Sequence, residues 1–107
     1  MQNAEGEKAI LNSKQRAWLR SQANSLDPVF QVGKGEIDES VVKATADCLA
    51  ARELIKMKVL ETSMYSAKEA AAILAEATGA DVVQVIGSKF VLFLKKDKDS
   101  KFDELPR

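Results

Sequence analysis

The feature that most constrains the fold is a short β-run that ends in Gly33-Lys34-Gly35 and leads almost directly into an amphipathic helix. Residues 29–32 form the β-run, and the two glycines allow a tight turn. Asp38 is the expected N-cap of a helix that reaches about Arg52. A second β-run, at residues 54–61, follows this helix. Because a helical crossover joins parallel strands, this unit predicts an α/β fold.

One further helix is expected before this unit in the sequence and one after it. Residues 13–26 are predicted to form a helix that starts at the Asn12 cap and ends before Asp27-Pro28, since the residue before a proline is pushed out of the helical region. Ser66 and Glu69 have the spacing of a capping box and open a third helix, which Gly79 closes.

The chain then returns to strand patterns. Residues 82–86 and 90–94 are apolar runs, and the Gly87-Ser88 pair between them suits a type II′ hairpin turn. The predicted element order is therefore α-β-α-β-α-β-β. It implies a two-layer α/β fold with a mixed four-stranded sheet, in which the last hairpin adds an antiparallel pair.

Apolar periodicity predicts which side chains form the core. In residues 54–61, three apolar side chains alternate with Lys56 and Lys58, which gives the strand one lysine-bearing face. The helix after Asp38 presents one apolar stripe, and the third helix packs through its alanines together with Ile73 and Leu74. The aromatic residues and the single cysteine are also expected in the core: Trp18, Phe30, Cys48, Phe90 and Phe93.

Length and composition favour one soluble domain. The 107 residues carry 16 basic and 16 acidic side chains, so net charge gives no argument for a nucleic-acid partner. We expect a flexible lead at residues 1–10, a folded domain at 11–95 and a charged, flexible tail at 96–107. A lone cysteine suits a reducing compartment, which favours the cytoplasm. No apolar run approaches a membrane span, so no membrane contact is expected.

The chain contains no histidine, the commonest general base and metal ligand. One cysteine alone cannot build a zinc site. We therefore expect no catalytic residues, no metal, no cofactor and no small-molecule substrate, and we expect a monomer.

Gly33-Lys34-Gly35 has two interpretations. A lysine at a glycine turn beside a helix N-terminus could hold a phosphate, because the helix adds backbone N–H donors and a partial positive charge. Alternatively, the segment is a tight turn with a solvated lysine.

Four blocks of the chain resemble the CRM domain family (chloroplast RNA splicing and ribosome maturation). They are residues 11–20, 28–35, 51–56 and 78–92. The stand-alone bacterial members of the family are the most similar. The resemblance implies a fold similar to the C-terminal domain of bacterial translation initiation factor three. It also implies RNA binding without catalysis, on ribosomal RNA in precursors of the large ribosomal subunit.

The resemblance also suggests where RNA would bind. Family members carry a Gly-x-x-Gly loop after the first strand, and here Glu36 stands in place of its second glycine. We expect a basic surface that joins the first helix to this loop, with recognition of the RNA backbone rather than a base-by-base code. The expected RNA-binding residues are Lys14, Arg16, Arg20, Gly33, Lys34, Gly35, Lys56, Lys58 and Lys89.

Two other functions stay open from the sequence. The same fold could serve as a protein-interaction adaptor without RNA contact. A small enzyme is less favoured, because Glu39, Asp47, Glu69 and Glu76 have the pattern of solvated helix charges. Strong salt dependence of binding would indicate phosphate contacts and so distinguish an RNA binder from an adaptor.

Overall fold

The computed structural model describes residues 12–95 and confirms the predicted order of elements. The predicted lead at 1–10 and tail at 96–107 lie outside the described residues. The elements are α1 (Ser13–Ala23), β1 (Phe30–Val32), α2 (Glu39–Arg52), β2 (Leu54–Val59), α3 (Ala67–Thr78), β3 (Asp81–Ile86) and β4 (Lys89–Phe93).

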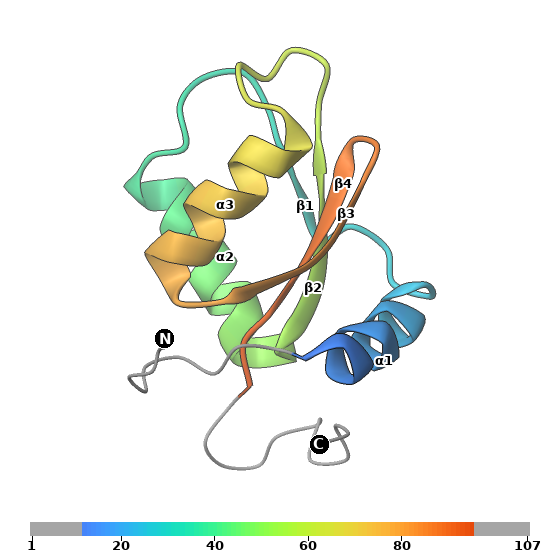
Figure 1. The fold of residues 1–107 in the computed structure, drawn as a ribbon. Coiled ribbons are helices and arrows are strands. Elements are labelled where there is room, and N and C mark those ends of the chain that lie inside the picture. The colour runs from blue at the N-terminus through green and yellow to red at the C-terminus, as the bar shows by residue number, and fades with distance from the viewer. Residues whose placement is uncertain (1–11, 96–107) are drawn as a thin grey trace.

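Four strands form one mixed sheet in the order β1-β2-β4-β3 (Figure 1). β1 pairs with β2 in parallel, as expected for strands joined by a helix, while β4 is antiparallel to both β2 and β3. β4 thus lies between β2 and β3. Its run of Phe90, Val91, Leu92 and Phe93 is buried throughout, as is typical of a strand covered on both faces.

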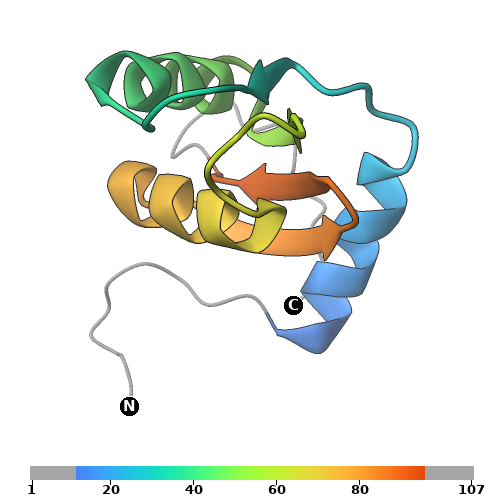
Figure 2. The same cartoon turned by 90° about the horizontal axis from the view of Figure 1, so that it is seen from above.

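Helices cover both faces of the sheet (Figure 2). α2 and α3 lie side by side on one face and form the predicted helical layer. α1 lies on the other face, against β2 and β3. The two-layer expectation therefore describes the sheet with α2 and α3, and α1 adds a partial third layer.

Each face of the sheet has its own hydrophobic cluster. Alternation along β2 sends Ile55, Met57 and Val59 towards α2 and α3, and sends Leu54 towards Leu19 and Ala23 of α1. Phe90 and Phe93 are buried, and Trp18, Phe30 and Cys48 are half-buried against the clusters, which confirms the predicted core positions. One core prediction is wrong: Leu74 is fully buried, but Ile73 is 38% exposed, because it faces outward from α3.

Local signals fixed most element ends. Capping boxes open α1 at Asn12 and α3 at Ser66, and Gly79 closes α3 in the left-handed conformation (φ 81°). Gly87 has φ 57° while Ser88 keeps a negative φ, which fits the predicted type II′ turn. α1 ends at Ala23, three residues before the end that was predicted from the Asp27-Pro28 pair.

Candidate nucleic-acid interface

Three lysines share the sheet face on which α1 lies. Lys56 and Lys58 come from β2 and point away from α2 and α3, as their alternation with buried neighbours predicted. Lys89 comes from β4 and is the direct cross-strand partner of Lys58. We call Lys56, Lys58 and Lys89 the lysine face.

None of the three lysines of the lysine face forms an ion pair with another residue in 12–95. Lys43 and Asp47 form an ion pair within α2 (Nζ–Oδ2 3.3 Å), away from these three lysines. Like charges placed directly across a strand pair repel each other, at a cost of about 0.2–1 kcal/mol. A bound anion such as an RNA phosphate would relieve the repulsion between Lys58 and Lys89.

One flank of α1 borders the lysine face. Arg16, Arg20 and Asn24 follow one another at four-residue spacing and so lie along one side of the helix. The Arg16 guanidinium donates a hydrogen bond from Nη1 to the Val82 carbonyl (2.8 Å). That carbonyl lies at a β-bulge, where the pairing of β3 with β4 shifts between Val82 and Gln84. Arg16 therefore links α1 to the edge strand β3 by a hydrogen bond, whether or not it also contacts RNA.

A shallow hollow of about 210 Å³ lies between α1 and the strands. It is lined by Asn24 from α1, Lys56 from β2, Gln84 and Ile86 from β3, and Lys89, Phe90 and Val91 from β4. Neither the Asn24 nor the Gln84 side-chain amide is hydrogen-bonded to another described residue. The hollow thus combines cations, free amide groups and an apolar surface on which Ile86 is 62% exposed.

Gly33-Lys34-Gly35 lies at another end of the molecule (Figure 1). Gly35 has φ 100°, a conformation that requires glycine, and the Lys34 side chain is exposed. Two connections meet here: residues 33–38, and residues 60–66, which are tied to β1 by the hydrogen bond from Leu60 N–H to the Val32 carbonyl (2.9 Å). We call these two connections the loop end.

The N-terminus of α2, next to the loop end, is capped by a carboxylate of its own chain. Three residues separate Gly35 from Glu39, and the Asp38 carboxylate already accepts hydrogen bonds from the N–H groups of Ser40 and Val41. The Ser40 hydroxyl and these N–H groups lower the pKa of the Asp38 carboxyl below its usual value. A phosphate at this helix terminus would therefore meet a carboxylate.

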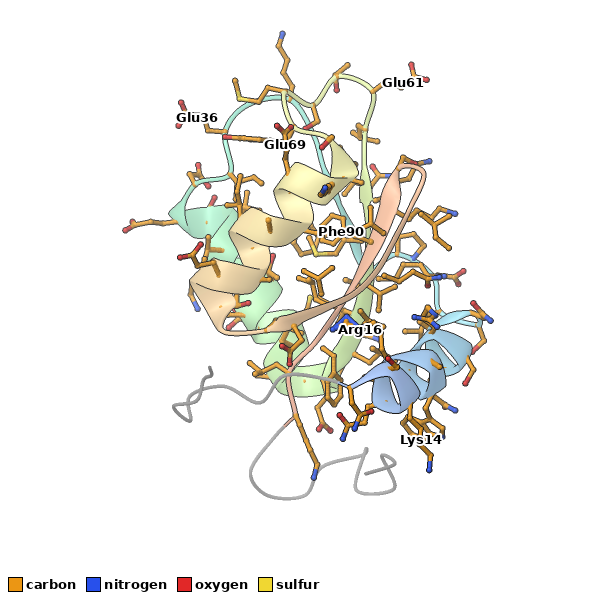
Figure 3. The ribbon with its side chains drawn as sticks, in the orientation of Figure 1. Lys14, Arg16, Glu36, Glu61, Glu69 and Phe90 are labelled. Carbon is orange, nitrogen blue, oxygen red and sulfur yellow. The ribbon has the colours of Figure 1, made fainter. Side chains whose placement is uncertain are left out.

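The loop end also carries other negative charges. Glu36, Glu61 and Glu69 all lie towards it, as Figure 3 shows, and all three are exposed. Glu36 projects outward and is not the helix cap, which is Asp38. Glu69 accepts a hydrogen bond from the Ser66 N–H in the α3 capping box. Lys34 is thus a cation among carboxylates, unlike the lysines of the sheet.

The first helix and the glycine loop, which we expected one basic surface to join, do not adjoin each other. α1 packs on Leu54 at the start of β2, whereas the loop packs beside Leu60, just past its end. Six residues of strand span about 20 Å. The two views agree that α1 and the loop lie at opposite ends of the molecule.

The predicted site residues therefore fall into three groups. Arg20, Lys56, Lys58 and Lys89 line or border one face, with Arg16 beside them. Gly33, Lys34 and Gly35 lie at the loop end. Lys14 is exposed and points away from the sheet (Figure 3).

The two amide residues of the hollow, Asn24 and Gln84, were not expected from the sequence as site residues. Asn24 had a usable signal, because it continues the four-residue spacing of Arg16 and Arg20. Gln84 had none, since the bulge shifts the alternation of β3 and turns Gln84 to the face opposite that of Val82.

Residues 12–95 contain neither a cluster of metal-ligating side chains nor a membrane-spanning helix. No group of three potential metal-ligating side chains comes together in that part of the chain. No helix in it has the length and apolar character needed to cross a membrane.

Comparisons with known proteins match nearly the whole described chain. The CRS1 / YhbY (CRM) domain family matches residues 11–93. The chain is 41% identical to "Probable RNA-binding protein YqeI" of Bacillus subtilis, over 91% of this chain and 100% of that protein. It is 39% identical to a probable RNA-binding protein of Methanocaldococcus jannaschii, over 92% of this chain and 74% of that one.

A solved structure shares the fold as well as the sequence. The solution structure of a hypothetical protein from Staphylococcus aureus superposes with a TM-score of 0.71 at 44% identity, over 91% of this chain and 100% of that one. Three helices, a mixed four-stranded sheet and a family match over residues 11–93 agree. The chain belongs to the CRS1 / YhbY (CRM) domain family.

Proposed function

We propose that this protein binds RNA through the lysine face and the adjoining flank of α1. The observation that carries the proposal is the direct pairing of Lys58 with Lys89 beside Lys56, with no acidic partner among the described residues. Phosphates would neutralise this cluster and release counterions from the RNA. The names of the relatives in Bacillus subtilis and Methanocaldococcus jannaschii, which describe them as RNA-binding, support the same partner.

The more specific part of the proposal concerns the RNA. The resemblance to stand-alone bacterial members of the family suggests ribosomal RNA in precursors of the large ribosomal subunit, bound by a cytoplasmic monomer that assists assembly. The proposed role is binding without catalysis, since the chain has no histidine to act as a general base.

The test is a salt titration of the full chain against labelled fragments of large-subunit ribosomal RNA, followed by crosslinking. Affinity should fall linearly on a log–log plot with a slope of about −0.7 per phosphate contacted in single strands. Crosslinked peptides should contain Lys56, Lys58 or Lys89. Salt-insensitive retention on ribosomal particles through a protein component would instead identify an adaptor. RNA recovered from other sources would overturn the assembly role but not RNA binding.

A further inference from the structure

We infer that the hollow beside α1 holds one unstacked base of a single-stranded RNA. This inference rests on the proposed RNA-binding function and names the form of RNA that the lysine face takes. The lysines alone would suit any nucleic-acid backbone. The hollow adds three features that binding of a nucleic-acid backbone does not require. They are two side-chain amides, an exposed apolar side chain and a depression in the surface.

The amides are the polar part of the hollow. Asn24 reaches it from the end of α1 and Gln84 from the β-bulge, so they come from elements 60 residues apart in the chain. An amide offers a donor and an acceptor together, which matches the edges that unpaired bases expose. In a duplex those edges are already paired.

The apolar part gives a base a surface to lie on. Ile86 is 62% exposed on the edge strand, and its cross-strand partner is Lys89. Val91 lies behind it as part of the buried floor. At about 210 Å³, the hollow is smaller than the ~300–1,000 Å³ of ordinary small-molecule pockets, so it suits one flat ring rather than a cofactor.

The lysines place the backbone next to the base. Lys56 and Lys89 line the hollow, and Lys58 continues the positive charge along β2. A strand that inserts one base would thus have its neighbouring phosphates on the lysine face. The contributions of phosphate contacts and of base contacts to the affinity can therefore be measured separately. The lysines set the salt dependence of binding, and the uncharged amides do not.

The test uses the full chain and four RNAs: a single strand, the same strand with one abasic nucleotide, a strand with abasic nucleotides throughout, and the matching duplex. The variant is Asn24→Ala/Gln84→Ala, which changes no charge, and the control is Gln31→Ala, another amide on the same sheet face. We expect the double variant to bind the intact single strand roughly 5–10-fold more weakly at an unchanged salt slope, as loss of one or two hydrogen bonds would give. It should bind the fully abasic strand as the wild type does.

Three further outcomes decide between the proposals. In ¹⁵N spectra, the side-chain amide signals of Asn24 and Gln84 should shift on addition of the single strand and not of the duplex. Equal binding of single strand and duplex, with no effect of the double variant, would overturn the base-binding hollow and leave RNA binding intact. Failure of the wild type to bind any of the four RNAs would overturn the proposed function itself. Circular dichroism and thermal unfolding confirm that the variants are folded.

Discussion

The lysine face carries three cations and the loop end carries one, Lys34, and the two regions also differ in what surrounds those charges. At the loop end, Lys34 is exposed on a glycine turn and shares the region with Glu36, Glu61 and Glu69. On the lysine face, the cations project from paired strands, and none of them forms an ion pair with another residue in 12–95. Strand pairing fixes the backbone positions of these lysines before any partner arrives, so binding has to order only their side chains.

This difference shows why a motif alone is a weak guide to a binding surface. A glycine loop with a lysine has the residue types that a phosphate needs, but the helix beside it is capped by its own aspartate. The lysine face has no motif, yet its charges are concentrated by strand pairing. Charge that is close in space and uncompensated is what attracts an anion.

The largest expected effect comes from removing the lysine face. The triple variant Lys56→Gln, Lys58→Gln, Lys89→Gln should lose on the order of 100-fold in affinity for single-stranded RNA, and its salt slope should fall by roughly 2. Its thermal stability should stay level or rise slightly, because the Lys58–Lys89 repulsion disappears. Binding titrations at two salt concentrations and thermal unfolding measure both.

The matched control for that triple variant replaces three lysines elsewhere: Lys14, Lys43 and Lys68. It removes the same charge without touching the lysine face and should bind RNA within a few-fold of the wild type. An equal loss of affinity in both triple variants would mean that only overall charge matters, and the comparison between the two regions would fail.

The next largest effect is on stability and concerns the hydrogen bond that links α1 to β3. Arg16→Ala removes the hydrogen bond to the Val82 carbonyl and should destabilise the fold by about 1–2 kcal/mol, which is a fall in Tm of several degrees. Arg16→Lys should recover part of that loss. If Arg16→Ala kept the wild-type Tm but lost RNA affinity, Arg16 would act mainly as an RNA contact.

A smaller effect is expected at the loop end. Lys34→Ala should weaken RNA binding only a few-fold and lower the salt slope by at most about 1. Glu36→Gln should strengthen binding slightly if RNA passes near this loop, since it removes one carboxylate without changing the backbone. A larger loss for Lys34→Ala than for the triple lysine variant would reverse the ranking of the two regions.

The smallest effect is a pH dependence at the α2 cap. Because folding lowers the pKa of Asp38, its contribution to stability is present above the unfolded value of 3.8 and is lost as the pH falls through the lower folded value. Asp38→Asn keeps a capping acceptor but does not titrate. Thermal unfolding between about pH 5 and pH 3 should therefore be less steeply pH-dependent for Asp38→Asn than for the wild type.

The sequence by itself determined the elements and most of their faces. Capping residues at Asn12, Asp38 and Ser66, and turn residues at Gly79 and Gly87, act through bonds within a few residues, so they can be read locally. Alternation in β2 likewise assigned Lys56 and Lys58 to the face opposite the α2–α3 core.

Only the tertiary structure decided how those faces meet. The insertion of β4 between β2 and β3 placed Lys89 opposite Lys58, although 31 residues separate them in the chain. The docking of α1 on the second face, and the bulge in β3, brought Asn24 and Gln84 into one hollow and kept α1 away from the glycine loop. Strand order and helix docking follow from burying two separate apolar clusters at once. That requirement involves the whole chain and leaves no signal in any one segment.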